Sequence, residues 1–183
     1  ALAKQAFCLG ARVTLISGPT NLKVPYGIKC INVTSAKDMF RAVKENYQNN
    51  DFIIKAAAVG DYRIKEIASE KIKKKDDNLV LEMVKNDDIL QYLGNHKTNQ
   101  IICGFAMETE NLINHAKEKF IKKNCDLLVA NNLKDEGAGF SKDTNKVTLI
   151  TKDKIEEKEI MSKDDVSKMI LTKLMEIEEE RKC

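Results

Sequence analysis

The chain reads AAAVGDYRIKEIASEKIKKK from Ala56 to Lys75, and this stretch is the most informative part of the sequence for the fold. It begins as the end of an apolar run, Phe52–Val59, which is typical of a strand in a buried parallel sheet. The run breaks at Gly60, and Asp61 follows at once. Ligands of open α/β sheets bind at the carboxyl ends of the strands. We therefore predict a ligand-facing strand end here.

The second half of the same stretch is rich in lysine. Four lysines lie within five residues and Ile72 alone interrupts them: Lys71, Lys73, Lys74 and Lys75. Such a cluster can bind a polyphosphate and stabilise the charge that develops as pyrophosphate leaves. The alternative is a solvated loop, since charge runs usually face water. Composition alone leaves both interpretations open.

Short apolar runs alternate with amphipathic helical patterns along the rest of the chain. Strands are expected at Arg12–Ser17, Ile28–Val33, Gln100–Phe105 and Cys125–Ala130, followed by a hairpin of Lys146–Thr151 with Lys154–Ile160 and a last helix from Ser162. This alternation predicts an α/β fold of the Rossmann-like, doubly wound class. Its sheet is expected to be mostly parallel, with a C-terminal antiparallel hairpin.

Helix starts and one further strand complete the prediction. Ser35 with Asp38 forms a capping box, Asn86 or Asp87 is expected to cap a short helix, and Thr109 is expected to cap a helix that ends near Lys123. The alternating run Leu79–Val84 predicts a strand that could serve as a dimer contact.

One domain, residues 1–183, is the simplest reading of the chain. Ala1–Leu9 has the pattern of the back half of a helix, whereas a doubly wound fold normally opens with a strand and its ligand-binding loop. We therefore expect that first strand and loop to lie upstream.

Composition and missing motifs exclude several classes of protein. Lys and Arg number 31 against 28 Asp and Glu, a net charge of +3, which argues against a nucleic-acid partner. Five scattered cysteines without C-x-x-C spacing favour a reduced, cytoplasmic protein. No apolar run approaches the roughly 20 residues of a membrane span, so no membrane contact is expected.

The chemistry-bearing motifs are equally selective. Neither His96 nor His115, the two histidines, falls at a predicted strand end, which argues against a Ser/His/Asp triad or a histidine-bound metal. The phosphate loop G-x-x-x-x-G-K-[ST] and the dinucleotide fingerprint G-x-G-x-x-G are both absent from the sequence. Metal ligands stay undefined.

Three strand ends rich in small residues predict a shared pocket: AAAVGD, GFAMET and ANN. Small residues there let a ligand approach the backbone, although tight helix packing also favours them. Asp61 could accept ribose hydroxyls or help to hold Mg²⁺ beside phosphates, or could simply be a turn residue. Lys119 and Lys123 lie four residues apart and face one way on their helix.

Taken in order, these motifs resemble phosphopantothenoylcysteine synthetase of the bacterial type. The matching stretches span nearly the whole chain: VTLISGP, AAAVGDYR, SEKIKKK, MVKNDDIL, GFAMETEN, KEKFIKKN with DLLVANN, and GFSKDTNKVTLI. The resemblance implies a ligase in which 4′-phosphopantothenate attacks the α-phosphate of CTP and the amine of L-cysteine then attacks the acyl cytidylate. It also implies Mg²⁺, a homodimer, and a flavin-dependent decarboxylase domain that can be fused upstream.

The resemblance also assigns roles by position. Lys55, Ala56, Ala57 and Phe105 would enclose the cytosine, and Asp61 would contact ribose or metal-bound phosphates. Lys71 is the lysine of a flap that meets the triphosphate, and thus the catalytic candidate. The remaining nucleotide-site residues are Asp87, Asp88, Ile89, Leu90, Lys119 and Lys123, and the backbone of Ala57 and Ala58 would face the pantothenate.

The chain departs from the family pattern in places. Lys75 stands where the flap motif usually ends in glutamine, and Asp87 replaces the proline of NPDI. The family's opening glycine-rich loop and an asparagine linked to handling of the acyl cytidylate are absent from the sequence. A chain without them is expected to bind CTP yet fail at turnover. The alternatives are a non-catalytic nucleotide or polyanion-binding module and, with less support, a nicotinamide-binding dehydrogenase.

Overall fold

The computed structural model describes residues 1–73, 78–108, 111–132 and 143–182. Three residues to which the sequence assigned a role, Lys74, Lys75 and Thr109, lie outside the described residues. No helix in the described part of the chain combines the length and apolar character needed to cross a membrane.

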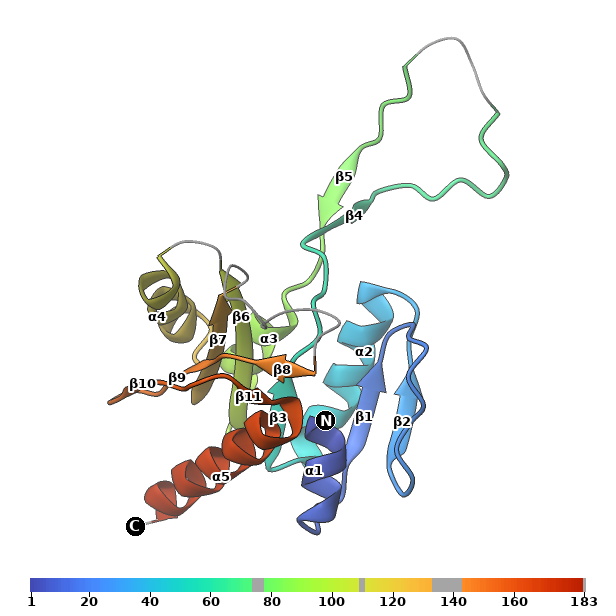
Figure 1. Cartoon of the computed structure of the whole chain (residues 1–183). Helices are drawn as coiled ribbons and strands as arrows, with labels where there is room; N and C mark the ends of the chain where they lie inside the picture. Colours follow the sequence, from blue (N-terminus) through green and yellow to red (C-terminus); the bar gives the residue numbers. More distant parts are fainter. Residues whose placement is uncertain (74–77, 109–110, 133–142, 183) are drawn as a thin grey trace.

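A five-stranded mixed sheet forms the centre of the molecule (Figure 1). Its strands lie in the order β10 (Ile155–Glu157), β9 (Thr148–Ile150), β7 (Leu127–Asn132), β6 (Ile101–Glu108) and β3 (Phe52–Lys55). β3, β6 and β7 are parallel, whereas β9 and β10 form the antiparallel hairpin. The predicted fold class, with its C-terminal hairpin, is confirmed.

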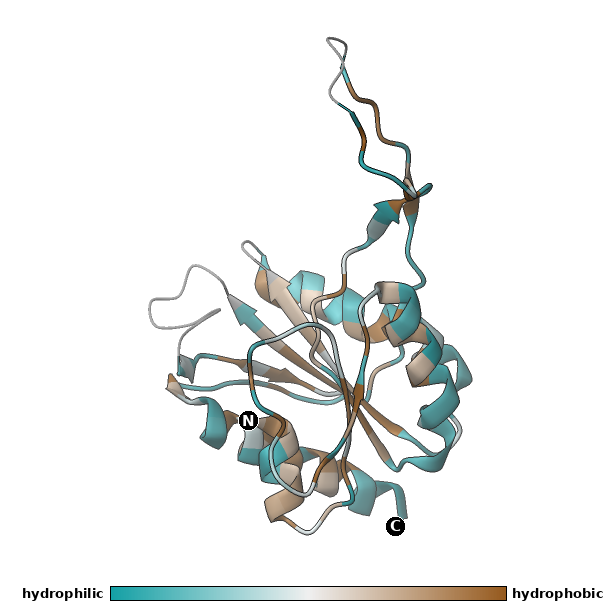
Figure 2. Ribbon diagram, turned by 90° about the vertical axis from the view of Figure 1, so that its right-hand side faces the viewer, coloured by the Kyte–Doolittle hydropathy of each residue, from teal (hydrophilic) through white to brown (hydrophobic). Residues whose placement is uncertain are grey.

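Both faces of this sheet are buried, because apolar side chains follow one another without a polar alternation. Ile102 and Leu128 pack on one face, and their neighbours Ile101 and Leu127 pack on the other. Figure 2 shows the hydrophobic strands enclosed between helices. One face is covered by α2 (Ala36–Asn46), α3 (Ile89–His96) and α4 (Leu112–Lys122), and the other by α1 (Leu2–Cys8) and α5 (Lys163–Lys182).

The ends of the helices confirm some predicted caps and correct others. Ser35 and Asp38 form the expected capping box of α2. The N-cap of α3 is Asp88, and neither Asn86 nor Asp87 takes that role, because the Asp88 side chain accepts the Gln91 N–H at 2.9 Å. The Thr109 prediction is also wrong. α4 begins at Leu112 with Asn111 as its N-cap, in a left-handed conformation.

A second, two-stranded sheet stands beside the main one. β1 (Thr14–Ser17) pairs in parallel with β2 (Lys29–Asn32). Among the described residues neither strand is hydrogen-bonded to β3. A cavity of about 330 Å³ instead separates β1 from β3. Short pieces complete the chain: a 3₁₀ turn at Tyr47–Asn49, β8 (Thr144–Asn145) and β11 (Met161–Ser162).

Residues 62–73 and 78–85 form a projection that we call the arm. Its base is the antiparallel pair β4 (Tyr62–Ile64) and β5 (Met83–Lys85), and it stands away from the rest of the molecule (Figure 1). Two predicted strands are shorter than expected: the Phe52–Val59 run is extended only as β3, to Lys55, and of Leu79–Val84 only the last two residues join β5. Beyond β5 the two sides of the arm still share one backbone hydrogen bond, from Lys65 N to Glu82 O at 2.9 Å.

Candidate functional site

A cavity of about 630 Å³ lies at the carboxyl ends of β3, β6 and β7, where the sequence analysis placed the ligand. Parallel pairing puts these ends at one edge: Lys55 is level with Gly104, and Met107 with Asn131. Every predicted site residue except Lys71 lines the cavity: Lys55, Ala56, Ala57, Ala58, Asp61, Asp87, Asp88, Ile89, Leu90, Phe105, Lys119 and Lys123. Its size suits a small-molecule ligand.

The first wall is the segment that leaves β3. Ala56, Ala57 and Ala58 are exposed and carry only a methyl group each, so their backbone N–H and C=O groups are accessible to a ligand. Lys55 stands at the start of this wall. Burial lowers the pKa of the Lys55 amine, and the charge of Lys119 lowers it further. An incoming anion would relieve both effects, because it favours the protonated amine.

The second wall is the beginning of α3. The side chains of Ile89 and Leu90 are each only 3% exposed, since they pack into the core. What these two residues offer the cavity is therefore their backbone N–H groups in the first turn of the helix. Asp88 already satisfies the next N–H, that of Gln91. N–H groups at a helix start attract anions.

The third wall comes from the end of α4, where Lys119 lies in the last turn and Lys123 is the C-cap. The Lys123 side chain is only 14% exposed, and its amine donates to Asp88 Oδ2 at 2.5 Å. Burial would raise the pKa of Asp88. The hydrogen bonds from Lys123 and from the Gln91 N–H outweigh that effect and hold the pKa below its ordinary value. The Lys123 amine, a positive charge in the cavity wall, is therefore held in a fixed position.

Several lining residues were missed by the sequence analysis: Lys85, Asn86, Met107 and Asn131. Asn86 joins two walls, because its Nδ2 donates to Gly60 O at 2.8 Å and its N–H donates to Asp61 O at 2.8 Å. The first two lie in the motif MVKNDDIL and the last in the strand end ANN. These signals were in the sequence, but only strand pairing reveals which side chains reach the cavity.

Two carboxylates in the cavity are available to a cation. Asp61 and Asp87 line it, and their side chains make no hydrogen bond or ion pair with another described residue. Within the described ranges no group of three or more His, Cys, Asp or Glu side chains is arranged to hold a metal ion. Mg²⁺ is commonly held by one or two carboxylates together with substrate phosphates, so this donor set fits a nucleotide-borne Mg²⁺.

Lys71 is not brought to the cavity. It lies on the arm and is exposed, and the described cavity lining does not include it. Among the described residues of the arm, only Tyr62 and Lys85, at its base, line the cavity. The strands are held together there by an ion pair of Lys65 with Glu82, at 2.8 Å. The structure thus separates the predicted catalytic lysine from the predicted nucleotide residues.

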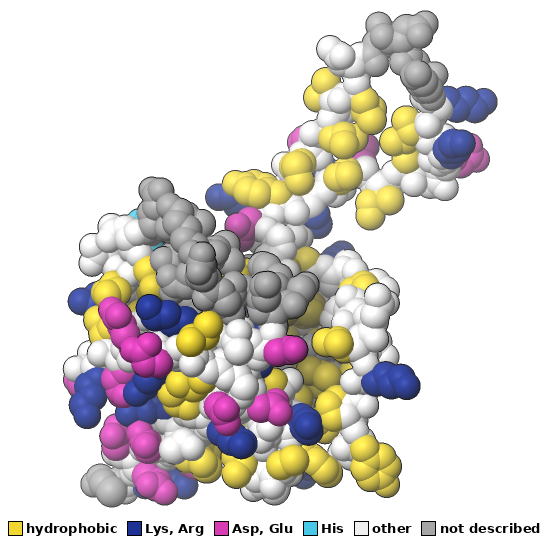
Figure 3. All heavy atoms as spheres, in the orientation of Figure 1, with side chains coloured by type: hydrophobic (Ala, Val, Ile, Leu, Met, Phe, Trp, Pro, Cys, Tyr) yellow, Lys and Arg dark blue, Asp and Glu magenta, His cyan; other side chains and the backbone are white. Residues whose placement is uncertain are grey.

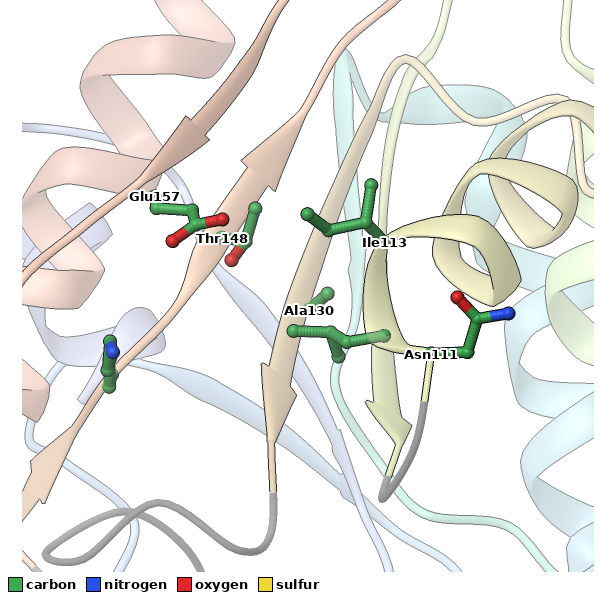
Figure 4. Close-up of a pocket in the computed structure, with 7 residues that line it drawn as sticks. Asn111, Ile113, Ala130, Thr148 and Glu157 are labelled. Carbon is green, nitrogen blue, oxygen red and sulfur yellow. The ribbon is translucent and has the colours of Figure 1, made fainter.

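A smaller hollow of about 340 Å³ lies between α4 and the hairpin (Figure 4). Asn111 and Ile113 line it from the α4 side, and Thr148 and Glu157 from the hairpin. Among its described lining residues, the charged ones are Lys146 and Glu157. It has neither the backbone wall nor the concentration of lysines of the larger cavity, which is therefore the candidate site.

The fold and the larger cavity define a Rossmann-like α/β domain that presents lysines and accessible backbone at the ends of its parallel strands. Residues 1–177 match the family model described as the DNA/pantothenate metabolism flavoprotein C-terminal domain. The chain belongs to this family.

Individual relatives agree with that assignment. The coenzyme A biosynthesis bifunctional protein CoaBC of Bacillus subtilis (strain 168) is 48% identical over 176 residues, which are 95% of this chain and 43% of that protein. The chain thus spans less than half the length of this relative. The crystal structure of the C-terminal domain of a CoaBC protein has a TM-score of 0.82 and 37% identity, covering 97% of this chain and 81% of that one. The resemblance drawn from the motifs is confirmed.

A more distant structure shares the fold. A Cab2 mutant in complex with phosphopantothenate-cysteine has a TM-score of 0.65 and 16% identity, covering 84% of this chain and 53% of that one.

Proposed function

We propose that this domain is a phosphopantothenate–cysteine ligase that uses CTP in coenzyme A biosynthesis. The observation that carries the proposal is the cavity at the carboxyl ends of β3, β6 and β7. It gathers the predicted nucleotide residues from four separate parts of the chain. The relatives, named for coenzyme A biosynthesis, support the same conclusion.

In the first step, a carboxylate oxygen of 4′-phosphopantothenate bonds to the α-phosphorus of CTP and the bond to pyrophosphate breaks. Lys119 and Lys123 would neutralise the phosphates, and the free N–H groups of Ile89 and Leu90 would add hydrogen bonds. Phe105 and the strand end from Lys55 would hold the base. Mg²⁺, when bound with the nucleotide, would supply further charge neutralisation between the phosphates and Asp61 or Asp87.

In the second step, the amine of L-cysteine attacks the acyl carbon, an amide bond forms, the amine loses a proton and CMP leaves. The backbone of Ala57 and Ala58 would hold the pantothenate chain beside the nucleotide. These residues carry no bulky side chain that would block the amine. The domain would thereby join two small substrates through a mixed anhydride without a covalent bond to the protein.

The arm is the part of the proposal that requires a change of position or a second chain. Apolar side chains gather along it (Figure 3), and Ile67, Val80 and Ile72 are 89%, 88% and 56% exposed. Exposed apolar rows of this kind mark surfaces that bind protein. We propose a homodimer in which the arm packs against a second copy and Lys71 acts as a flap lysine on the triphosphate.

We further propose that a strand upstream of Ala1 in a longer protein fills the space between β1 and β3. Residues 14–18 and 52–57 face one another across that cavity, and α1 and α5 line its continuation on one side. A strand followed by α1 and then β1 would form an ordinary parallel crossover unit. Adding that segment should slow amide hydrogen exchange in both β1 and β3. Unchanged exchange would refute this assignment.

The proposal includes a cytoplasmic location and, in a longer protein, an upstream flavin-dependent decarboxylase domain. Its central test is pyrophosphate release, with CTP and ATP assayed separately, from a version of the protein extended upstream. Release that requires 4′-phosphopantothenate, followed by amide formation on addition of L-cysteine, is expected with CTP. Binding of CTP without any release would instead favour a polyanion-binding module.

A further inference from the structure

The position of the Lys123 amine depends on how α3 and α4 pack together. α3 and α4 approach so closely at Gly94 that a methyl group there would lie 1.9 Å from Lys123 O. Asn124, in a left-handed conformation, donates from Nδ2 to Gly94 O at 2.8 Å. The backbone at the end of α4 is therefore fixed against α3, and only the side chain of Lys123 remains to be placed.

Asp88 places that side chain. Its Oδ1 accepts the Gln91 N–H at 2.9 Å, which fixes the carboxylate on the helix start, and its Oδ2 accepts from Lys123 Nζ at 2.5 Å. Gln91 assists, since its Oε1 lies 3.4 Å from the same amine and its Nε2 donates to Lys122 O at 2.9 Å. Both oxygens of Asp88 are thus engaged by the protein.

This arrangement leaves one N–H donor of the Lys123 ammonium for a ligand. A lysine ammonium has three N–H donors, of which Asp88 and Gln91 account for two. A lysine that is ordered before the ligand arrives loses less side-chain entropy on binding. Asp88 therefore improves anion binding indirectly, although its own charge repels an anion.

We propose that Asp88 is a positioning residue that holds Lys123 ready for a phosphate group of the ligand, and that it is not itself a ligand of the nucleotide. This inference rests on the proposed function, because it assigns the cavity to a phosphate-bearing ligand. It predicts a change in anion affinity opposite in direction to the one expected from the charges alone. Removal of a nearby negative charge ordinarily strengthens anion binding, whereas removal of Asp88 is expected to weaken it.

The test compares Asp88→Asn with Glu118→Gln in the 183-residue chain. Asparagine is as good an N-cap as aspartate, so the start of α3 is retained. Glu118→Gln removes one negative charge from an exposed position on α4, the helix that Lys123 caps. We expect Asp88→Asn to weaken binding of CTP and of inorganic tripolyphosphate on the order of tenfold, the worth of one charge-assisted hydrogen bond. Glu118→Gln should leave both unchanged.

A double-mutant cycle tests whether Asp88 acts through Lys123. In a Lys123→Met background, Asp88→Asn should change binding by less than about twofold, because the group that it positions is gone. Equal or tighter binding by Asp88→Asn overturns the proposal. So does a tenfold loss that persists in the Lys123→Met background, because Asp88 would then act on the ligand itself.

A measurement without ligand separates this inference from the proposed function. The ¹⁵Nζ ammonium signal of Lys123 should be visible by NMR, because its hydrogen bonds slow exchange with water, and Asp88→Asn should abolish it. If wild type binds no anion but shows the signal, the proposed function fails and the contact stands. If Asp88→Asn keeps the signal, the positioning role is refuted, whatever the chain binds.

Discussion

The cavity is supported by the core and the arm is exposed, although the stretch Ala56–Lys75 contributes residues to both. The cavity walls are anchored by strands β3, β6 and β7 and by helices whose apolar faces lie in the core. The arm has two short strands at its base and exposes its apolar side chains to solvent. The walls of the cavity are thus fixed by packing on the core, whereas the described residues of the arm have little such support.

The largest expected effect tests whether the arm ever reaches the cavity. Lys71→Ala, assayed in the upstream-extended protein, should lower kcat by about 10²–10³, the usual loss when a transition-state donor is removed. Binding of CTP should change far less. Lys73→Ala, two residues along the same exposed segment, is the matched control and should be near wild type. Equal losses in turnover and binding would make Lys71 a ground-state anchor, and no loss in either would leave the arm without a catalytic role.

The next effect tests how rigid the cavity is. Gly94→Ala places a methyl group 1.9 Å from Lys123 O, a backbone atom that cannot swing aside. The helices must separate, so we expect a loss of about 3 kcal/mol in the free energy of unfolding, measured with urea. Gly60→Ala, near the base of the arm, meets nothing closer than Tyr62 O at 3.7 Å and should change stability by less than about 0.5 kcal/mol. Similar losses in both would show that the close contact at Gly94 does not determine the loss of stability.

A third experiment asks what the arm binds. Val80→Asp places a charge on an exposed apolar position of the arm, and we expect self-association to weaken on the order of 100-fold in light scattering across a concentration series. Ile121→Asp, which alters an exposed position on α4 (77%), is the control and should leave the association constant unchanged. A wild-type chain that stays monomeric throughout would refute the homodimer, and a dimer that survives Val80→Asp would place the contact elsewhere.

The same contrast explains what could be predicted from the sequence. Apolar runs such as Gln100–Phe105 identified the buried strands, and parallel strands share a carboxyl edge, so the residues at their ends could be grouped from the sequence alone. The arm could not be predicted in this way. The alternation at Leu79–Val84 is a strand signal, but a strand requires a partner, and periodicity does not name one. The wrong caps at Thr109 and Asp87 have a local cause, since several adjacent polar residues could each begin the helix and backbone geometry selected Asn111 and Asp88.

The smallest expected effect is a pH dependence inside the cavity. The Lys55 amine faces Lys119 and Lys123 as well as Asp88 and Asp61, and burial with the neighbouring lysines lowers its pKa below the ordinary 10.5. A bound polyanion should raise that pKa again. Between the lowered value and the raised one, the complex therefore holds more protons than the free chain, and binding should weaken as the pH rises through the lowered pKa.

Calorimetry in two buffers of different ionisation enthalpy would measure this proton uptake, and Lys55→Met should abolish it. Free Lys55→Met should also be more stable than wild type at neutral pH, by about 1 kcal/mol, because it no longer buries a charged amine among cations. In the wild-type chain the free-energy cost of burying the charged amine declines as the pH rises from the lowered pKa of folded Lys55 toward its pKa in the unfolded chain. The stabilities of the two proteins should therefore converge at that higher pH. Proton uptake that survives in Lys55→Met would assign it to another group and remove Lys55 from the set of residues that recognise the anion.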